Sequence, residues 1–359
     1  MDRVESRVSV CEVERFGAFE PGTTADLLLE VPHGATRRAD FDAIHALLSP
    51  GLPSDLIDFF CVNTDVGSTE YGRAVARLVT APRPGRRPLR ALLIRCLIPR
   101  TFIDTNRVID ADPGRSGSGV AARDEVGAGS EVGAGSEVGA GSEVGAGEAA
   151  SGSQGVPAGR ERVAETRPTG LTGALAEYIR DPRDIETLVG LHRSYHQVVS
   201  RAYELTCGGG GLALMPHTYA PKNVSIESID EGIGAALRRA YGPDLYATWT
   251  MRPEIDLITE SPEGKGLAPG ALVERLKSNL SGAAFECAEN ASYRLHPITM
   301  GHRYSALYPG SVLCLEVRRD LLADPFSPFE EMVIGEAKVA RIAAPIADAV
   351  RAEFERRGI

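Results

Sequence analysis

The sequence lacks the features that mark membrane-spanning, nucleic-acid-binding and disulfide-bonded proteins. It contains no run of about 18 apolar residues, which a membrane-spanning helix needs. Its 49 Asp and Glu residues outnumber its 39 Lys and Arg residues, and phosphate binding needs clustered basic side chains. Six cysteines form no Cys-x-x-Cys pair, and the N-terminal segment is charged where a signal peptide would be apolar. We therefore expect reduced thiols in a cytoplasmic protein that has no nucleic-acid or membrane partner.

Three common catalytic motifs are absent as well. The four glycines at 208–211 are not followed by the Gly-Lys-Ser/Thr of a phosphate-binding loop, which favours a flexible turn. No Gly-x-Ser-x-Gly nucleophile elbow occurs. His192 and His196 are four residues apart, but no glutamate follows the first of them, so they lack the zinc signature His-Glu-x-x-His. We expect His196 to lie on the face of a helix.

One segment, residues 111–168, differs from the rest of the chain. The hexapeptide EVGAGS occurs three times in succession from residue 125, and an incomplete fourth copy follows. Side chains this small cannot bury enough apolar surface to offset the ordering entropy of so many glycines. We therefore predict a disordered Gly/Ala/Glu-rich insertion in a single domain that is formed by residues 1–110 and 169–359.

Outside this segment, apolar strand patterns alternate with helical patterns. Short continuous apolar runs predict buried strands at 26–31, 89–98, 212–215 and 311–317. Apolar residues at helical spacing predict helices at 67–80, 183–205 and 329–354. This alternation predicts an α/β fold with a largely parallel sheet, in which functional groups gather at the carboxyl ends of the strands.

Two histidines and a carboxylate stand where a zinc site is expected. His33 and His217 each follow an apolar strand and a proline, and imidazole nitrogen is a usual zinc ligand. Both could instead be loop histidines that bind nearby backbone groups. Asp65 precedes the helix at 67–80, where it would serve either as a helix cap or as the carboxylate ligand. Glu70, one turn further on, competes for the same ligand role.

Polar residues that follow the strand at 89–98 could bind substrate. Arg100, Asn106 and Arg107 lie in IPRTFIDTNRVID, and arginine forms bidentate pairs with carboxylates. A structural ion-pair network would explain the same residues. His302, in ITMGHRYS, is a further candidate for the lining of a substrate pocket.

Glu316 interrupts the apolar strand SVLCLEV. A carboxylate in such a strand is costly unless it is paired or functional. Next to an activated water it would be a general base. If it pairs with Arg318, its role is structural.

The order of these segments resembles that of the N-formylglutamate amidohydrolase family, which is related to the zinc carboxypeptidases and aspartoacylases. The resemblance rests on VPHG (31–34), NTDVGSTE (63–70), PRTFIDTNR (99–107), YH (195–196), MPH (215–217) and CLEVRR (314–319). It implies a three-layer α/β/α fold with a mostly parallel mixed sheet, like that of the zinc carboxypeptidases. It also implies one zinc ion per chain, bound by His33 and His217. The zinc carboxypeptidases use His-x-x-Glu, but Thr36 stands at that glutamate position, so Asp65 is inferred as the third ligand.

The resemblance further implies an amidohydrolase that acts on a small carboxylate-bearing substrate, such as an N-formyl or other N-acyl amino acid. Glu316 would be the general base toward a zinc-activated water. One of Arg100 and Arg107 would offset the charge on the oxyanion, and the other would hold the substrate carboxylate together with Asn106. A carboxypeptidase-like metallopeptidase acting on short peptides and a catalytically degenerate binding protein are the alternatives.

Overall fold

The chain folds around a seven-stranded mixed sheet, which is described in a computed structural model that covers residues 4–109, 173–226 and 228–359. The predicted insertion at 111–168 lies outside the described residues. The strands are β1 (Cys11–Phe16), β2 (Leu27–Val31), β3 (Ala91–Cys96), β4 (Leu212–Tyr219), β5 (Ile255–Ile258), β6 (Cys287–Glu289) and β7 (Val312–Arg318). Their order in the sheet is β1-β3-β2-β4-β7-β5-β6.

The centre of the sheet is parallel and its margins are mixed. Strands β3, β2, β4 and β7 pair in parallel, whereas β1 and β5 run antiparallel to their central neighbours. The central strands are continuous apolar runs because helices cover both faces of the sheet. The helices are α1 (Arg38–His45), α2 (Leu56–Asn63), α3 (Ser68–Thr80), α4 (Pro182–Thr206), α5 (Ile233–Ala240), α6 (Pro243–Thr248), α7 (Gly270–Gly282), α8 (Met300–Leu307) and α9 (Glu336–Arg356).

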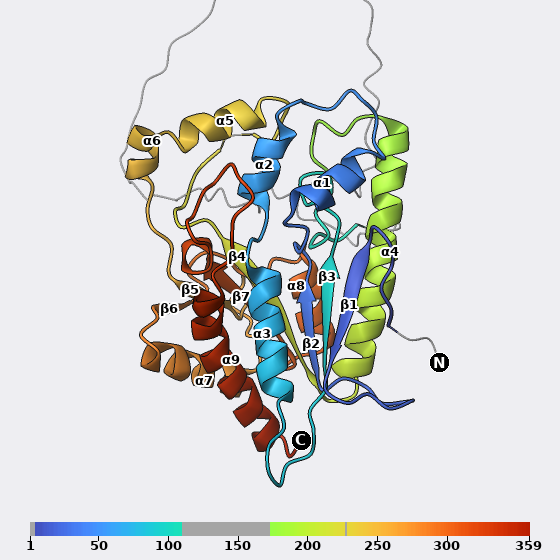
Figure 1. Cartoon of the computed structure of the whole chain (residues 1–359), viewed down its shortest axis with the longest axis vertical. Coiled ribbons are helices and arrows are strands. Elements are labelled where there is room, and N and C mark those ends of the chain that lie inside the picture. Colours follow the sequence, from blue (N-terminus) through green and yellow to red (C-terminus); the bar gives the residue numbers. More distant parts are fainter. Residues whose placement is uncertain (1–3, 110–172, 227) are drawn as a thin grey trace, which may run out of the picture.

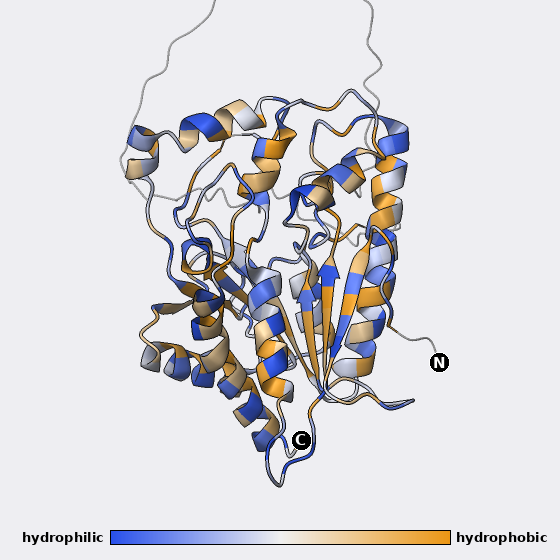
Figure 2. Cartoon of the chain, in the orientation of Figure 1, coloured by the Kyte–Doolittle hydropathy of each residue, from blue (hydrophilic) through white to orange (hydrophobic). Residues whose placement is uncertain are grey.

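Two apolar cores lie on opposite faces of the sheet. One core packs α3, α7 and α9 against the sheet, and the other lies under α4 and α8 and extends to α1, α2 and α5. Figure 1 shows α3 and α9 in front of the strands and α8 behind them. In Figure 2, β2 and β3 are hydrophobic along their shafts and hydrophilic at their arrowheads. The expected three-layer α/β/α architecture is confirmed, and polar groups gather at the carboxyl ends of its strands.

Two predicted boundaries differ from the structure by more than two residues. The strand predicted at 212–215 continues through Pro216 and His217 to Tyr219, because it pairs along this whole length with β7. The last helix begins at Glu336 rather than at residue 329, since Ile334 forms a β-bridge with Ala323 and Gly335 is the N-cap.

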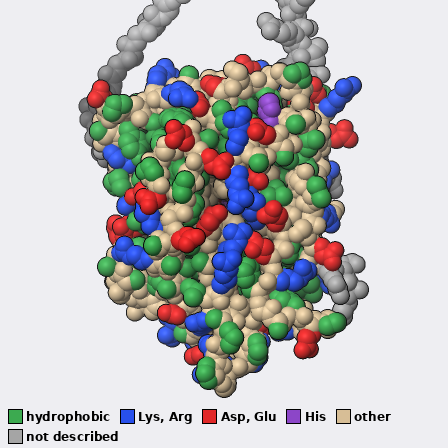
Figure 3. Space-filling view, in the orientation of Figure 1, with side chains coloured by type: hydrophobic (Ala, Val, Ile, Leu, Met, Phe, Trp, Pro, Cys, Tyr) green, Lys and Arg blue, Asp and Glu red, His purple; other side chains and the backbone are tan. Residues whose placement is uncertain are grey.

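The surface and the cysteines add two observations. On the face drawn in Figure 3, basic and acidic side chains are interspersed, and a vertical row of Lys and Arg is flanked by Asp and Glu. All six cysteines are free thiols, five of them buried, and burial raises the pKa of the Cys96 thiol to about 12. Among the described residues, no helix is long and apolar enough to cross a membrane.

Strand β2 also carries a fully buried carboxyl group, that of Glu30, which accepts a hydrogen bond of 3.0 Å from Tyr195 Oη. Burial raises the pKa of Glu30 from 4.5 to about 7, although hydrogen bonds to the carboxyl oppose the shift. A carboxyl group whose pKa is raised on folding favours the folded state below its unfolded pKa, and this contribution is lost as pH rises through the folded pKa. Deprotonation of Glu30 in the folded chain therefore costs on the order of 3 kcal/mol.

We expect Glu30→Gln to raise the melting temperature of chelator-treated protein by several degrees at pH 8 and by much less at pH 5. Glutamine keeps an acceptor for Tyr195 but cannot ionise. Thermal unfolding of the variant and of the exposed control Glu20→Gln, at both pH values, measures the difference. A gain that is the same at pH 5 and pH 8 would contradict the buried-acid explanation.

Candidate metal centre

A cluster of three buried side chains lies at the carboxyl ends of β2 and β4. The chain leaves β2 for β3 on one side and later returns to β4 on the other side of β2. In open α/β sheets, such a reversal of strand order leaves a crevice beyond the strand ends, where ligands bind. His33 follows β2 by two residues, His217 lies near the end of β4, and Asp65 lies in the turn between α2 and α3.

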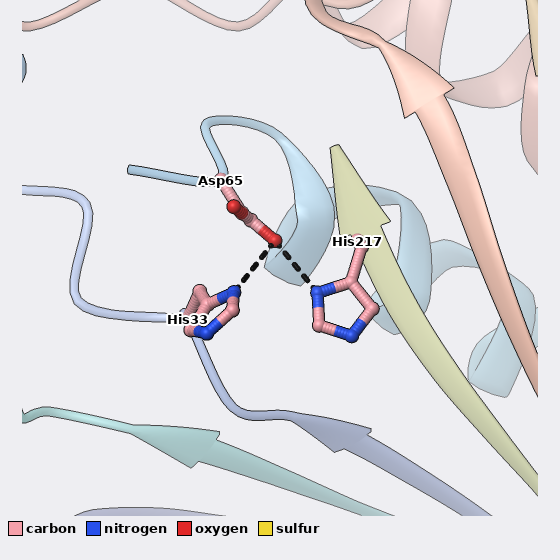
Figure 4. A group of neighbouring side chains, drawn as sticks. All are labelled: His33, Asp65 and His217. Atoms are coloured by element: carbon pink, nitrogen blue, oxygen red, sulfur yellow. Dashed lines mark hydrogen bonds and ion pairs between the residues drawn. The ribbon is translucent and has the colours of Figure 1, made fainter. Parts of the chain in front are cut away.

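The three side chains meet at one carboxylate oxygen (Figure 4). Asp65 Oδ2 lies 3.2 Å from His33 Nδ1 and 2.9 Å from His217 Nδ1. The two imidazole rings are 5.0 Å apart and tilted by 55°. One ligand atom from each of the three residues lies within 4.8 Å of the others.

The end of β4 explains why Asp65 is held at this place. Leu212 N donates toward β2, to Asp26 O, whereas Ala213 N donates toward β7, so even-numbered amides of β4 face β2. The pairing with β2 stops at Leu214, and Pro216, the next residue facing that side, has no N–H to satisfy. The N–H of Thr218 therefore meets no strand and donates to Asp65 Oδ2 over 3.3 Å.

Two glycines shape the backbone beside the ligands. A Cβ at Gly34, next to His33, would come within 2.6 Å of the Arg95 side chain. Gly67 has φ +90°, and a Cβ there would meet Leu322 at 2.8 Å. Only glycine fits both requirements at Gly67 without strain, so the turn that presents Asp65 depends on it.

His33 is held between two carboxylates. Its Nδ1 faces Asp65 and its Nε2 lies 2.8 Å from Asp104 Oδ1. Burial and Arg100 oppose protonation, but the two carboxylates outweigh them and raise the pKa of His33. With both ring nitrogens against anions, this imidazole either carries two protons or shares Nδ1 with another cation.

The carboxyl groups of Asp65 and Asp104 both have lowered pKa values, and in both cases the cause is the presence of cationic neighbours. Burial disfavours ionisation of Asp65, but His33 and His217 together hold its pKa far below the usual range. Burial acts in the same way on Asp104, where Arg100 and His33 hold the pKa well below the usual value. Asp65 and Asp104 are therefore buried anions, and neighbouring cationic groups offset their charges.

The donor set fits a divalent metal ion. Two imidazole nitrogens and one carboxylate oxygen are the ligands of many catalytic zinc sites, which keep a further position open. Asp104 accepts from His33 Nε2, as outer carboxylates commonly do for metal-binding histidines, and so leaves Nδ1 directed at the cluster. His33, Asp65 and His217 can thus hold a metal ion.

The structure separates the alternatives for Asp65. Its side chain caps no helix, because Gly67 is the N-cap of α3 and no side-chain cap is present. The explanation as a helix cap was therefore wrong. Of the two carboxylates that competed for the ligand role, Asp65 lies with the histidines, and Glu70 is not part of the described cluster.

The arginine-rich segment packs against the cluster through Asp104. Arg100 Nη2 and Arg107 Nε lie 3.3 Å and 3.4 Å from Asp104 Oδ2, and Arg100 Nη1 lies 3.9 Å from Asp65 Oδ1. The ion pairs of the structural alternative thus exist, and they place both guanidinium groups beside the candidate site. His192 Nε2 and His196 Nε2 bind the carbonyl oxygens of Arg107 and Thr105, which fixes the segment to α4.

The same segment is joined to α8. Asn106 O accepts from Met300 N, and Asn106 Oδ1 accepts from Gly301 N over 3.2 Å. Asn106 is therefore at least partly engaged in holding the start of α8. His302 lies in the first turn of that helix, half-buried, and within the described parts of the chain its ring makes no hydrogen bond to the cluster.

Glu316 lies next to His217 across the sheet. The two residues are register partners in the parallel pair of β4 and β7, so their side chains project from the same face. Among the contacts of the described residues, Arg318 pairs with Asp320 at 2.8 Å and with Glu254 at 3.9 Å.

The sequence reasoning missed Arg319 and Tyr71. Arg319 is only 1% exposed, and its Nη2 lies 3.6 Å from Asp65 Oδ1. Tyr71 Oη donates to the carbonyl oxygen of His217 over 3.1 Å. Neither contact has a local signal, because the partners are far apart along the chain. The one sequence feature that could have pointed to a role for Arg319 is that it is the second of two arginines at the end of an apolar strand.

Comparison with known proteins gives structural matches alone. No family model and no curated protein sequence matches the chain. The crystal structure of N-formylglutamate amidohydrolase from Ralstonia eutropha JMP134 aligns with a TM-score of 0.51 and 17% sequence identity, over 98% of this chain and 100% of that one. A gene product from Agrobacterium tumefaciens aligns with a TM-score of 0.49 and 15% identity, over 99% and 100%. At 17% identity, the first likeness supports the fold.

We expect the purified protein to bind about one divalent cation per chain, and the double variant His33→Ala/His217→Ala to lose it. Removal of two of the three donors leaves one carboxylate, which is too few for a stable site. Elemental analysis after dialysis against zinc measures the content, with the exposed His45→Ala as control. Equal metal content in the double variant would place any bound ion elsewhere.

Proposed function

We propose that this protein is a zinc-dependent amidohydrolase that cleaves the amide bond of a small carboxylate-bearing substrate, such as an N-formyl or other N-acyl amino acid. The observation that carries the proposal is the buried cluster of His33, Asp65 and His217, whose donor atoms lie within 4.8 Å of one another. The likeness in fold to an N-formylglutamate amidohydrolase supports the same reaction class. Zinc bound there would supply a Lewis acid and lower the pKa of a coordinated water toward about 7.

Glu316 is the proposed general base. The proposal is supported by the sheet register, in which Glu316 pairs with His217 so that both side chains project from the same face. The carboxylate accepts a proton from the attacking water as the oxygen bonds to the carbonyl carbon. It then delivers this proton to the amide nitrogen as the C–N bond breaks and the amine leaves, so that one group serves both proton transfers.

Arg100 and Arg107 are the proposed anion-binding groups. Both are anchored by Asp104, which also binds His33, so the guanidinium groups are held in a fixed relation to the metal site. One guanidinium offsets the negative charge that develops on the carbonyl oxygen. The other binds the substrate carboxylate together with Asn106, and His302 of α8 is the further residue proposed to contact the substrate.

Glu316→Gln is expected to retain bound zinc and to lower kcat about 100-fold to 10,000-fold, because glutamine cannot accept the proton. Steady-state hydrolysis of N-formyl amino acids and metal analysis of the same preparation measure both effects. The exposed Glu286→Gln serves as a control for loss of a carboxylate. Turnover at the wild-type rate would remove Glu316 from the mechanism.

If Arg107 is the arginine that binds the substrate carboxylate, Arg107→Ala is expected to raise KM for carboxylate-bearing substrates at least tenfold more than for the matching neutral amides, because the substrate loses a charged hydrogen-bond partner. The comparison uses an N-formyl amino acid and its carboxamide, with the exposed Arg193→Ala as the charge-matched control. Equal effects on both substrates would contradict the assignment of a carboxylate partner.

The substrate class itself is tested by offering short peptides with a free C-terminus beside N-formyl amino acids. We expect higher kcat/KM for the formyl compounds. A clear preference for peptides would favour the carboxypeptidase-like alternative. Zinc binding without hydrolysis of either class would favour a binding protein.

A further inference from the structure

Arg319 is a buried charged residue near the cluster that has no role in the proposed reaction. The residue follows β7 directly, in the short 3-10 helix Arg319–Leu321, and its side chain is almost completely buried. A guanidinium group is buried at considerable cost unless acceptors surround it. Such a residue close to a cation-binding cluster therefore needs a specific explanation.

The contacts of Arg319 join the segments that carry two of the three candidate ligands. Its Nη1 donates to Val62 O in α2 over 2.5 Å, and its Nη2 donates to Thr218 O in β4 over 3.3 Å. Nη2 also lies 3.6 Å from Asp65 Oδ1. One planar fork of donors thus connects the end of α2, the turn with Asp65 and the strand that contains His217.

Thr218 strengthens the same connection. Its Oγ1 donates to Val66 O over 3.0 Å and accepts from Arg319 Nε over 3.4 Å. Its backbone N–H donates to Asp65 Oδ2. Asp65 and Val66, in the turn between α2 and α3, are therefore hydrogen-bonded to the end of β4, beyond the part of that strand that pairs with β2.

The two oxygens of Asp65 consequently have different surroundings. Oδ1 faces the guanidinium groups of Arg319 and Arg100 at 3.6 Å and 3.9 Å. Oδ2 faces the two imidazoles. A carboxylate that could rotate freely would present either oxygen, or both, to a metal ion. The guanidinium contacts on Oδ1 favour the single orientation in which only Oδ2 is directed at the cluster.

We propose that Arg319 is a positioning residue for the metal site: it fastens the Asp65 turn to β4 and directs Oδ2 toward His33 and His217. The inference rests on the proposed zinc site. Arginine suits this role because its planar donors reach three acceptors at once, whereas lysine offers a single ammonium group. Groups that orient a metal ligand commonly change metal affinity 10-fold to 100-fold when they are removed.

The test compares the zinc affinity of the wild type, Arg319→Lys and Arg319→Met by competition with a chromophoric chelator. We expect Arg319→Met to raise the zinc Kd about 10-fold to 100-fold and Arg319→Lys to have an intermediate effect. Arg318→Met is the matched control, because the neighbouring Arg318 pairs with Asp320 and not with Asp65. Its Kd should equal that of the wild type.

Cobalt absorption separates positioning from a loss of general stability. The visible spectrum of the Co²⁺-loaded protein reports ligand number and geometry, and we expect it to change in Arg319→Met but not in Arg318→Met. If Arg319→Met does not fold, Thr218→Val, which removes only the hydroxyl contacts of the same network, provides the comparison, with a Kd rise of several-fold expected.

Each outcome is decisive. Wild-type zinc affinity and an unchanged cobalt spectrum in Arg319→Met, or in Thr218→Val where that variant is used, would overturn the role of Arg319 while leaving the proposed function intact. A wild-type protein that binds neither zinc nor cobalt would overturn the proposed zinc site and, with it, this inference.

Discussion

The hydrogen bonds of the Asp65 carboxylate to the two imidazoles are the interaction on which the rest of the site depends. A carboxylate that is fully buried in the protein is stable only where cationic or hydrogen-bonding groups replace water. Here the two histidines, two arginines and one backbone N–H do so. These groups come from distant segments of the chain, so the carboxylate can be accommodated only when the surrounding strands and turns are all in place.

The fold provides that environment through the way its central strands end. The pairing between β2 and β4 stops at Leu214 of β4, while β4 continues along β7, so the last residues of β4 have no strand on the β2 side. A proline is tolerated there, and the next amide on that side is available to Asp65. The same extension brings His217 level with Glu316. The early end of the β2–β4 pairing and the continuation of β4 along β7 thus determine where Asp65, His217 and Glu316 lie.

The sequence predicted correctly those features that depend on residues close together along the chain. The apolar central strands predicted the sheet, positions at strand ends pointed to His33 and His217, and the position ahead of a helix pointed to Asp65. The choice between Asp65 and Glu70 depended on how the turn enters α3, which involves Gly67 and Leu322, far apart in the chain. Arg319 and Glu30 escaped notice for a similar reason. Their roles come from tertiary contacts, which neither hydrophobic periodicity nor motif spacing encodes.

A further contact holds each of the three candidate ligands in place. Asp104 holds the far side of the His33 ring, Tyr71 binds the backbone of His217, and Arg319 faces the second oxygen of Asp65. His33 Nδ1 and Asp65 Oδ2 lie 3.2 Å apart, close enough to share a proton in a hydrogen bond. A divalent cation would need the lone pair of that nitrogen, so its binding would displace any proton held there. The same arrangement of an imidazole and a carboxylate thus suits either a proton or the proposed metal ion.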